Sequence, residues 1–535
     1  MRARAKHLNR PATISALAIR LAGKIAGAAS STSGPTGKIL DTYSFDAGGM
    51  KVEIKVRKED EFAPIYEVYT PVVEEGTKLY ILKTLKGQLI SQVKLDMNEI
   101  IDPKLAFTVR KKFEERANAL LEQHFPALPE DKKRMLIAYL IQNTLGLGEL
   151  EAPMGDEQLE EIVINSSNDP VWVYHKKHGW CRTNVRVRSE EMIYDYAAII
   201  GRRVGKQINT LNPLMDAHLV TGDRVNATLF PISTFGNTIT IRKFSKNPWT
   251  LPTLIESNCL SAQVASLLWL CIQNELSLLV SGGTGSGKTS FLNALTCMFP
   301  QNQRVISIED TRELTLPSFL QWVPLSTREP NAEGKGEVSM LDLMVNSLRM
   351  RPDRIVVGEV RRQREAEIMF EAMHTGHAVY ATIHADNAAE TISRMTNPPI
   401  NIPHAMLDVL SGIVVQFRHR RLGIRRTLEF AEVLKQGDIN VLYRWDLRDD
   451  KIKEVNQMSA LIETLSLYAG MNSKSIASDM EEKTKVLTWM TKHKYNQVDA
   501  VGRIVARYYS DPEFILSLAE NDRPWQAMSA IGGEG

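Results

Sequence analysis

A glycine-rich stretch near the middle of the chain has the spacing of a phosphate-binding loop. Residues 282–289 read GGTGSGKT, which fits the pattern G-x-x-x-x-G-K-[ST]. An apolar run, LSLLV at 276–280, precedes it and the helix-forming FLNAL follows it, so the expected order is strand, loop, helix. Glycines let backbone N–H groups turn toward one phosphate, and the helix N-terminus adds positive potential. The alternative is a glycine-rich turn with a chance lysine, which the agreement of pattern and context disfavours.

This loop predicts a site for ATP and Mg²⁺. Lys288 is expected to reach the β- and γ-phosphates, and the Thr289 hydroxyl is expected to bind Mg²⁺. The residues expected to hold the nucleotide are Gly282, Gly283, Thr284, Gly285, Ser286, Gly287, Lys288, Thr289 and Ser290.

Hydrolysis also needs a carboxylate near the attacking water, and acidic residues follow two predicted strands. IEDTREL offers Glu309, Asp310 and Glu313, with a solvated acidic turn as the alternative. In VVGEV, Glu359 closes an apolar strand, and its alternative is a salt bridge to a neighbouring arginine, Arg361 or Arg362.

Three histidines lie in HTGHAVYATIHAD: His374, His377 and His384. No cysteine or tight ligand set accompanies them, which disfavours a metal site. His384 follows a predicted strand and is placed to hydrogen-bond phosphate. For His377, direct chemistry and a structural hydrogen bond between helix and strand stay equally open.

The elements that must position these residues alternate between strand and helix. RVISIED (304–310), DRIVVGEV (353–360) and HAVYATIHA (377–385) predict short strands, and EAEIMFEAMHTG predicts a helix between the last two. This order predicts an α/β fold with a mainly parallel sheet and helices on both faces. QFRHRRLGIRRTLEFAEVL predicts a hairpin that turns near Gly423, and the chain from about 456 onward predicts helices.

Upstream of this unit, the pattern changes several times. Residues 42–100 alternate apolar and polar, including KVEIKV and KLYILKTL, which favours strands. Residues 101–150 favour helices, and 157–247 mix strands with a helix at EEMIYDYAAIIGRRVG. The proline-containing FSKNPWTLPT is the expected linker.

Composition limits the class of protein. The 535 residues allow several domains, and a net charge of +2 argues against a generally polybasic nucleic-acid binder. Four scattered cysteines give neither a zinc cluster nor a disulfide framework and favour a reducing compartment. The apolar run at 264–272 is too short to span a bilayer. The first forty residues contain no acid; a signal peptide and a membrane-surface helix are alternatives to the favoured flexible tail.

Together these motifs resemble those of the secretion ATPase superfamily of type II and type IV secretion, type IV pili and the archaellum. GGTGSGKTS resembles its Walker A box, and VISIEDTREL its aspartate box, with Glu313 at the catalytic glutamate. RPDRIVVGEVR resembles its atypical Walker B box, with Glu359 at the acidic position that also serves the metal. TGHAVYATIHA resembles its histidine box, with His377 and His384 at the two histidines. The C-terminal pattern KVLTWMTKHKYNQVDAVGRIVARYYSDPE, at 485–513, is most similar to that of the archaeal branch, the archaellum and archaeal pilus ATPases.

The resemblance implies a RecA-like P-loop ATPase domain preceded by a smaller, PAS-like α/β domain. The implied division is a basic flexible tail at 1–40, a β-rich and helical unit at 41–150, the PAS-like domain at 151–246, a linker at 247–253, the RecA-like domain at 254–440 and a helical region at 441–535. Arg224 in GDRVN and Arg242 in TITIRKF match the family's arginines that reach the nucleotide; a surface strand position is the alternative for each.

The resemblance further implies a homohexamer that hydrolyses MgATP in the cytoplasm, in peripheral contact with the inner face of the cell membrane. Its expected partner is a polytopic membrane platform protein of a filament or secretion machine, and no specific nucleic acid is expected. One alternative is a RecA-like nucleic-acid motor such as a conjugative DNA-transfer ATPase, which needs a basic, aromatic-lined channel. A second alternative is a scaffold that is gated by bound nucleotide and scarcely hydrolyses it.

Overall fold

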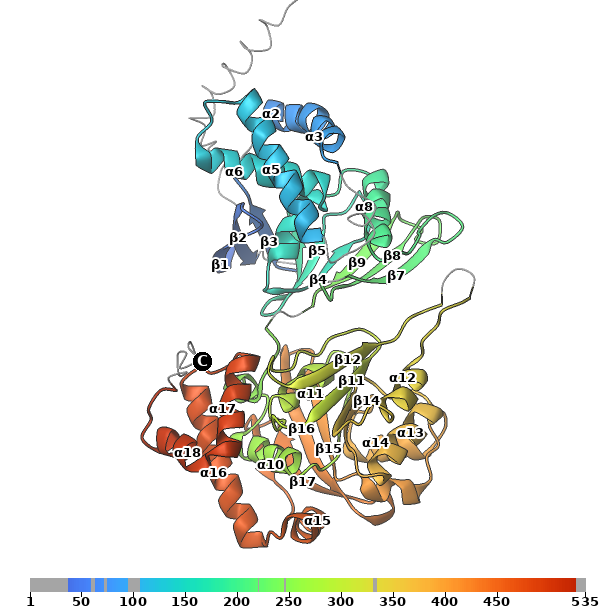
Figure 1. The fold of residues 1–535 in the computed structure, drawn as a ribbon, viewed down its shortest axis with the longest axis vertical. Helices are drawn as coiled ribbons and strands as arrows, with labels where there is room; N and C mark the ends of the chain where they lie inside the picture. Colours follow the sequence, from blue (N-terminus) through green and yellow to red (C-terminus); the bar gives the residue numbers. More distant parts are fainter. Residues whose placement is uncertain are drawn as a thin grey trace, which may run out of the picture. The chain divides into compact units, whose positions relative to one another are not determined.

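The computed structural model describes residues 37–58, 63–71, 75–94, 106–219, 221–244, 247–330 and 334–525. The chain divides into two compact units, 1–245 and 246–535, shown in blue to green and in green to red in Figure 1. Most of the expected tail, residues 1–36, lies outside the described residues. Strand β1 begins at Lys38, so the end of the range expected as tail is already part of the sheet.

The first unit is built on one sheet with the strand order β1-β2-β3-β6-β5-β4-β9-β8-β7. Its strands are β1 Lys38–Asp46, β2 Lys51–Lys58, β3 Ile65–Tyr69, β4 Leu159–Ile164, β5 Trp172–His175, β6 Gly179–Thr183, β7 Leu214–His218, β8 Arg224–Thr228 and β9 Thr238–Arg242. The pairing of β3 with β6 is parallel and joins strands from both sides of the expected boundary at 150. The β-rich segment and the α/β segment therefore share one sheet.

Helices of the first unit form two groups. Their bounds are α2 Glu75–Tyr80, the π-helical η1 Ile81–Leu85, α3 Lys86–Gln92, α5 Ala106–His124, α6 Glu130–Thr144, η3 Gly148–Leu150, α7 Glu151–Gly155 and α8 Glu190–Arg203. Buried residues of α8 pack in one core with the sheet, whereas η1, α3, α5 and α6 share a separate core. Ser189 begins α8 by accepting a hydrogen bond from the backbone of Met192.

The expected strand at KLYILKTL is helical in the structure, and this correction has a clear cause. Ile81, Leu85 and Leu89 are fully buried and recur every four residues, which places them on one face of a helix. They pack against α5 and α6. The short run of alternating residues resembled a strand only because its window stopped before Leu89.

The second unit is a doubly wound α/β layer structure, which confirms the predicted fold class. Its sheet has the order β12-β11-β13-β14-β10-β15-β16-β17-β18, parallel from β12 to β15 and antiparallel beyond. The strands are β10 Leu278–Gly282, β11 Arg304–Glu309, β12 Gln321–Ser326, β13 Arg354–Val357, β14 Ala378–Ile383, β15 Gly412–His419, β16 Ile424–Val433, β17 Ile439–Asp446 and β18 Lys451–Glu454. The last two strands extend past the expected start of the helical region at 441.

Helices cover both faces of this sheet (Figure 1). They are α9 Leu251–Glu256, α10 Ala262–Gln273, α11 Lys288–Thr296, α12 Met340–Ser347, α13 Gln363–His374, α14 Ala388–Thr396, α15 Ala460–Ala469, α16 Ser473–Lys492, α17 Val498–Ser510 and α18 Pro512–Glu520, with 3-10 turns η4 His404–Val409 and η5 Lys435–Gly437. Val280 packs in the core with α10, α11, α16 and α17, and its neighbour Leu279 packs with α12, α13 and α14. Alternate residues of β10 thus face opposite layers. Helix α9 begins inside the expected linker.

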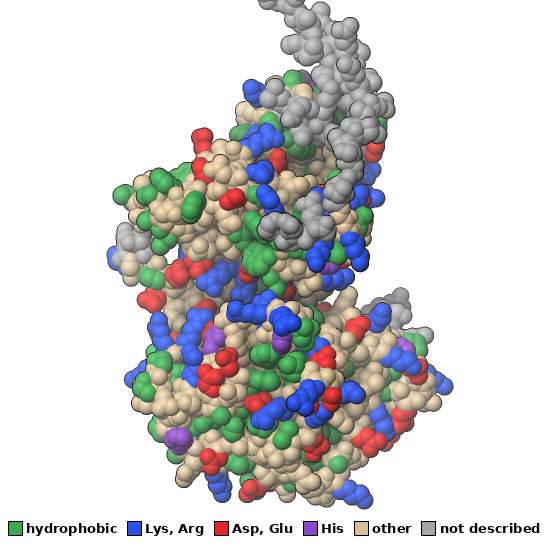
Figure 2. Space-filling view, turned by 180° about the vertical axis from the view of Figure 1, so that it is seen from behind, with side chains coloured by type: hydrophobic (Ala, Val, Ile, Leu, Met, Phe, Trp, Pro, Cys, Tyr) green, Lys and Arg blue, Asp and Glu red, His purple; other side chains and the backbone are tan. Residues whose placement is uncertain are grey.

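The surface carries both signs of charge. On the face shown in Figure 2, basic and acidic side chains both appear on each unit. The mixture of signs on this face agrees with the net charge of +2. None of the helices in the described parts of the chain is long and apolar enough to cross a membrane.

Candidate active site

The glycine-rich loop connects the central strand β10 to helix α11. Gly282, Gly285 and Gly287 have φ angles of 148°, 71° and 96°, which side chains rarely allow. At Gly282 a Cβ atom would lie 2.2 Å from the carbonyl oxygen of Gln416, so glycine is required there also by space. Gly287 is the N-cap of α11 and offers no side-chain cap, so the N–H groups of the first turn can bind an anion.

Lys288 lies in this loop, and its ammonium group already has hydrogen-bond partners. Its side chain is buried, and Nζ donates to the carbonyl oxygens of Gly282 at 2.9 Å and Gly283 at 3.0 Å. Nζ also lies 3.3 Å from Nδ1 of His384. The ammonium group is therefore positioned at the loop, where phosphate oxygens could replace the carbonyl partners.

His384 and Glu359 are brought together beside the loop, from the carboxyl ends of β14 and β13. His384 Nε2 lies 3.0 Å from Glu359 Oε1, and Arg361 Nη2 donates to Glu359 Oε2 at 2.6 Å. Arg361 also donates to Asp310 Oδ2 at 2.9 Å. One connected network thus links Lys288, His384, Glu359, Arg361 and Asp310. The salt bridge considered as an alternative for Glu359 is present, and it coexists with the contact to His384.

Electrostatics set the protonation of this network. Burial lowers the pKa of His384, the Lys288 charge lowers it further, and Glu359 acts in the opposite direction. The imidazole is therefore mainly neutral near pH 7. The hydrogen bond to Glu359 raises the pKa of Arg361, which keeps the guanidinium charged. A neutral imidazole between a cation and a carboxylate can exchange hydrogen bonds when the charge at the loop changes.

Glu313, the expected catalytic glutamate, is positioned by a second acid. Glu309 ends β11 and is 2% exposed, and its Oε1 accepts hydrogen bonds from the backbone N–H groups of Glu313 at 2.9 Å and Leu314 at 3.0 Å. Burial raises the pKa of Glu309 to about 7. Glu309 therefore fixes the turn that presents the half-buried Glu313. The available sequence signal for Glu309 was its position as the last residue of an apolar strand.

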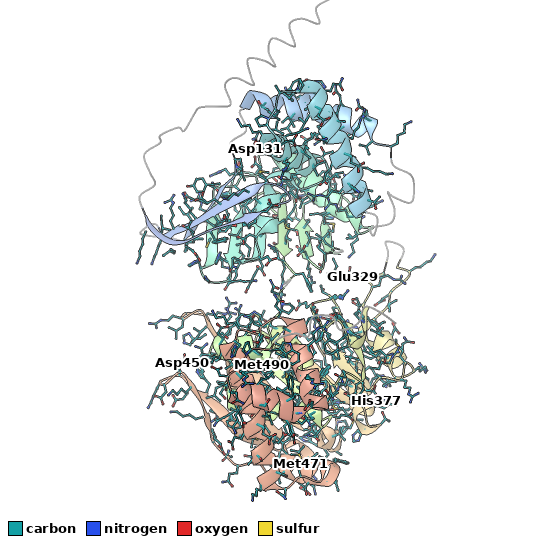
Figure 3. The ribbon with its side chains drawn as sticks, turned by 60° about the vertical axis from the view of Figure 1, so that its left-hand side comes forward. Asp131, Glu329, His377, Asp450, Met471 and Met490 are labelled. Carbon is teal, nitrogen blue, oxygen red and sulfur yellow. The ribbon has the colours of Figure 1, made fainter. Side chains whose placement is uncertain are left out.

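His377 is not brought to this network, which corrects its placement in the site. It precedes β14, so it lies at the opposite end of that strand from His384. Its Nδ1 lies 3.1 Å from the carbonyl oxygen of Ala372 in α13 and 3.1 Å from the Thr375 hydroxyl. This is the structural contact between helix and strand that sequence reasoning had left open. Figure 3 shows His377 on the opposite side of the second unit from Asp450.

The two candidate arginines are neighbours in the sheet of the first unit. Arg242 of β9 is in register with Arg224 of β8 and with Glu161 of β4. Both arginines are exposed. Arg224 Nε donates to Asp216 Oδ1 at 3.1 Å. The structure thus places both predicted residues on one exposed strand pair, and their action on nucleotide stays a prediction.

Sequence reasoning missed two further arginines beside the loop. Arg418 of β15 and Arg425 of β16 face each other across the hairpin. Arg425 Nε donates to the carbonyl oxygen of Gly285 at 3.1 Å, and a Cβ on Gly285 would lie 2.9 Å from Arg418 Nη1. The density of basic residues in QFRHRRLGIRR was the available signal, but only the pairing of β10 with β15 brings the hairpin to the loop.

The residues at this edge fit a nucleotide with Mg²⁺. Three left-handed glycines, an uncapped helix start and a buried lysine suit a polyphosphate. Mg²⁺ prefers oxygen ligands, and Thr289 in the first turn of α11 and the carboxylate of Glu359 offer them. When bound, the ion would neutralise phosphate charge.

Fold and loop define a RecA-like P-loop ATPase, and comparison with known proteins specifies the family. The family model described as "Type II/IV secretion system protein" matches residues 159–427. The chain belongs to this family, which confirms the resemblance found in the motifs.

Relatives extend the match beyond these residues. MJ0781, an uncharacterized protein of Methanocaldococcus jannaschii, is 36% identical over 89% of this chain and 90% of its own length. Rv3659c of Mycobacterium tuberculosis, named for conjugal transfer, is 31% identical over 55% of this chain and 86% of its own length. Among solved structures, the VirB11 ATPase of the Brucella suis type IV secretion system, with sulphate, matches 52% of this chain and 91% of its own at 25% identity and a TM-score of 0.28.

Proposed function

We propose that the protein hydrolyses MgATP to power the assembly or rotation of a pilus-like filament, or protein secretion, through a membrane platform protein. Family membership supports a secretion or pilus ATPase. The observation that carries the proposal further is the connection of Lys288, through His384, to Glu359 at the edge where the loop opens. Such a network can respond to phosphate, which a passive binding module does not require.

Each residue of the network has a distinct proposed role. Lys288 exchanges its carbonyl partners for phosphate oxygens, and Thr289 with Glu359 holds Mg²⁺. Glu313, fixed by Glu309, orients and deprotonates the attacking water. His384 contacts both Lys288 and Glu359, so loss of the γ-phosphate would change its hydrogen bonds. This change is the proposed signal from chemistry to movement.

The proposed working form is a homohexamer in the cytoplasm, in peripheral contact with the inner face of the membrane. Arg242 and Arg224 are proposed to approach the nucleotide, where a guanidinium can stabilise transferred-phosphate charge. Both are exposed on neighbouring strands, so their side chains are accessible to a ligand. The archaeal relative that matches most of the chain is consistent with the archaeal branch.

Comparison of two arginine variants tests this proposal. Arg242→Ala should lower turnover by roughly 10³-fold while nucleotide affinity changes little, as for other arginines that act on the transition state. Arg182→Ala is the matched control, because Arg182 is also exposed on a strand of the same sheet. Affinity, turnover and oligomer size are measured for each. Equal turnover in both variants, with the hexamer intact, would exclude Arg242 from the chemistry.

The class of motor is tested separately by what stimulates wild-type turnover. Stimulation by anionic liposomes that contain the platform protein supports the secretion or filament motor. Stimulation by DNA alone would favour a DNA-transfer motor, and nucleotide binding without turnover under either condition would favour a gated scaffold.

A further inference from the structure

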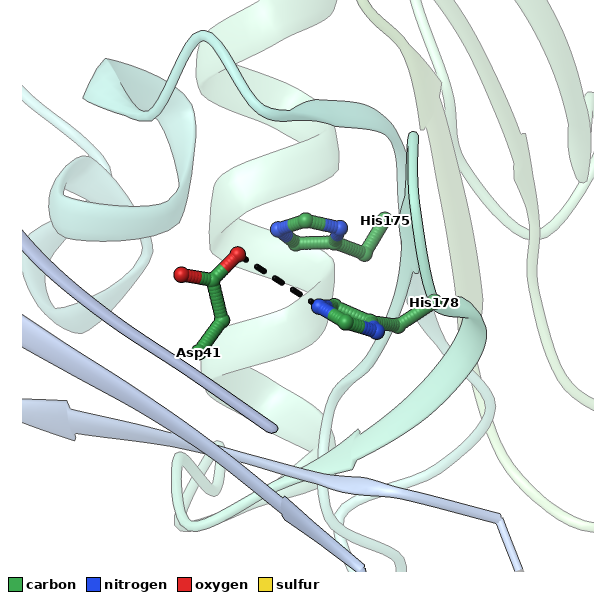
Figure 4. A group of neighbouring side chains, drawn as sticks. All are labelled: Asp41, His175 and His178. Carbon is green, nitrogen blue, oxygen red and sulfur yellow. Dashed lines mark ion pairs between the residues drawn. The ribbon is translucent and has the colours of Figure 1, made fainter. Parts of the chain in front are cut away.

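We propose that Asp41, His175 and His178 in the first unit form a binding site for a first-row divalent metal ion, with Zn²⁺ as the best-suited ion. The site is independent of the nucleotide loop. Asp41 lies on β1, His175 ends β5, and His178 lies in the turn before β6. Figure 4 shows the three side chains converging from these elements. One possible ligand atom from each lies within 4.8 Å of the others.

The donor set and spacing suit zinc. Two imidazole nitrogens and one carboxylate oxygen are ligands that Zn²⁺ prefers, at about 2.0–2.2 Å each. Two ligand atoms on one tetrahedral ion are therefore roughly 3.4 Å apart. His178 Nε2 and Asp41 Oδ2 already lie 3.5 Å apart. Moving the third ligand from at most 4.8 Å needs a contraction of about 1.4 Å, which side-chain rotation can supply.

An unsatisfied nitrogen points into this cluster. His178 Nε2 is buried and has no hydrogen-bond partner. Its 3.5 Å approach to Asp41 is within ion-pair range but lacks hydrogen-bond geometry. Buried polar atoms without partners are rare, and a bound ion is one of the recognised reasons for them. A metal ion between His178 and Asp41 would give this nitrogen its partner.

The surrounding contacts hold His175 in place and also show what binding must change. The Tyr43 hydroxyl lies 3.3 Å from His175 Nε2 and donates to Asp156 Oδ2 at 2.6 Å. The backbone N–H of Lys177 donates to His175 Nδ1 at 3.1 Å. Coordination through Nε2 would leave the ring proton on Nδ1, which opens this hydrogen bond and also ends the contact between Nε2 and the Tyr43 hydroxyl. Losing these two hydrogen bonds is a small cost beside metal coordination.

Lys177 supplies a competing cation. Its Nζ lies 3.6 Å from Asp41 Oδ2, the oxygen that faces His178, and its side chain is 68% exposed. A metal ion and this ammonium would therefore compete for one carboxylate. If the three residues bind a metal ion, removing the Lys177 charge should strengthen metal binding. If they serve only as an ion-pair cluster, removing it would weaken the cluster.

The ion would join strands that are not neighbours in the sheet. β1 is the edge strand, and β2, β3 and β6 separate it from β5 in the strand order. The contact between Asp41 and the β5–β6 turn therefore needs the edge of the sheet to curl over. A metal ion would fix this curled edge, so its role is structural and its signature is a metal-dependent thermal stability.

The test uses the full-length chain, stripped with a chelator, in excess Mg²⁺ so that oxygen-ligand sites are filled. Zn²⁺ is titrated by calorimetry into wild type, Asp41→Asn, His178→Ala and the control His374→Ala, which removes an exposed histidine. We expect one Zn²⁺ site that is retained in His374→Ala and weakened at least tenfold in the other two. The wild-type melting temperature should rise with Zn²⁺, and Lys177→Ala should bind several-fold more tightly.

Equal Zn²⁺ binding by wild type and by folded Asp41→Asn and His178→Ala would overturn the proposal, as would weaker binding by Lys177→Ala. Where a variant fails to fold, X-ray absorption of zinc-loaded wild type and His374→Ala decides. Two histidine ligands in both proteins support the site, and none overturns it. Because ATP turnover is not the readout, these outcomes are independent of the proposed motor function.

Discussion

Two buried cations lie at opposite ends of the parallel strands in the second unit, and their partners differ in kind. We call the end where the strands finish the carboxyl edge and the end where they begin the amino edge. Lys288, at the carboxyl edge, bonds the carbonyls of the glycine loop and contacts His384. Arg354, at the amino edge, is fully buried; it donates to Gln303, to the Tyr380 hydroxyl and at 2.8 Å to the carbonyl of Ile272, and it stacks 4.7 Å from the Phe299 ring.

The difference shows how burial alone fails to distinguish function from structure. The partners of Arg354 are fixed inside the core, so its charge stabilises packing. Those of Lys288 are carbonyl oxygens of a loop that also contains the exposed residues Thr284 and Gly285, so a ligand that reaches the loop can replace them. The carboxyl edge should therefore respond to substitution mainly in activity, and the amino edge mainly in stability.

The largest effect is expected for Lys288→Ala. Loss of the ammonium group should abolish ATP turnover and weaken nucleotide binding, because the phosphates lose their point charge. Turnover and nucleotide affinity are measured beside Lys435→Ala, which removes a surface lysine of the same unit. Undiminished hydrolysis by Lys288→Ala would show that ATP hydrolysis does not take place at the carboxyl edge.

Glu313→Gln should slow hydrolysis by roughly 10²-fold while MgATP binding is kept, because only activation of water is lost. Glu371→Gln on the exposed face of α13 is the matched control. Single-turnover rates and equilibrium binding separate the two steps. If binding fails together with turnover, Glu313 holds the metal or the loop instead.

At the amino edge, Arg354→Met should lower the free energy of unfolding by about 3 kcal/mol, because it leaves several buried acceptors without a donor. Urea denaturation is compared with that of Arg364→Met, whose side chain is 79% exposed. Turnover per folded molecule should stay near wild type. A selective loss of turnover at unchanged stability would contradict the division between the two edges.

Glu309→Gln should change how stability depends on pH. The folded-state pKa of Glu309 is raised to about 7 from 4.5, so burial favours the protonated acid. Its contribution to stability is fully present below about pH 4.5 and is lost as pH rises toward 7. The neutral variant keeps that contribution, so its advantage should grow across this window to on the order of 2–3 kcal/mol. Urea midpoints at pH 5 and pH 8 check this, and a pH-independent difference would refute it.

The smallest effect is expected for His377→Ala. His377 contacts Ala372 and Thr375 at the amino edge, so its loss should cost about 1 kcal/mol of stability and leave turnover within about twofold. His384→Ala, at the other end of the same strand, should reduce turnover far more. Equal losses of turnover in the two variants would show that the two ends of β14 do not differ in this way, with a structural role for His377 and a catalytic role for His384.

Local patterns predicted the loop and the strands because their information lies within a few residues. Gly282, Gly285 and Gly287 are fixed by the backbone angles that the loop needs, so their spacing was visible in the sequence. His377 was grouped with His384 in the site because the two share one motif. The strand predicted at 377–385 already placed the two histidines at opposite ends, and β14 has this arrangement.

Long-range pairing explains what the sequence did not reveal. Arg418 and Arg425 are remote from the loop in the chain, and the register of β10 with β15 brings them to it. Asp41 likewise meets His175 and His178 only after the sheet of the first unit has formed. Such contacts depend on which strands become neighbours, and hydrophobic patterns do not specify this.

The parallel pairing of β3 with β6 has a practical consequence for how this protein can be divided. The amide of Arg182 donates to the carbonyl of Pro64 at 2.9 Å, and Ile65 and Tyr66 continue the pairing. A shortened chain that began near residue 151 would keep the family-matched segment but uncover the backbone edge of β6. Uncovered strand edges recruit other chains and aggregate. Strands β1 to β3 are therefore an integral part of this sheet, and a shorter version for biochemistry should begin before β1.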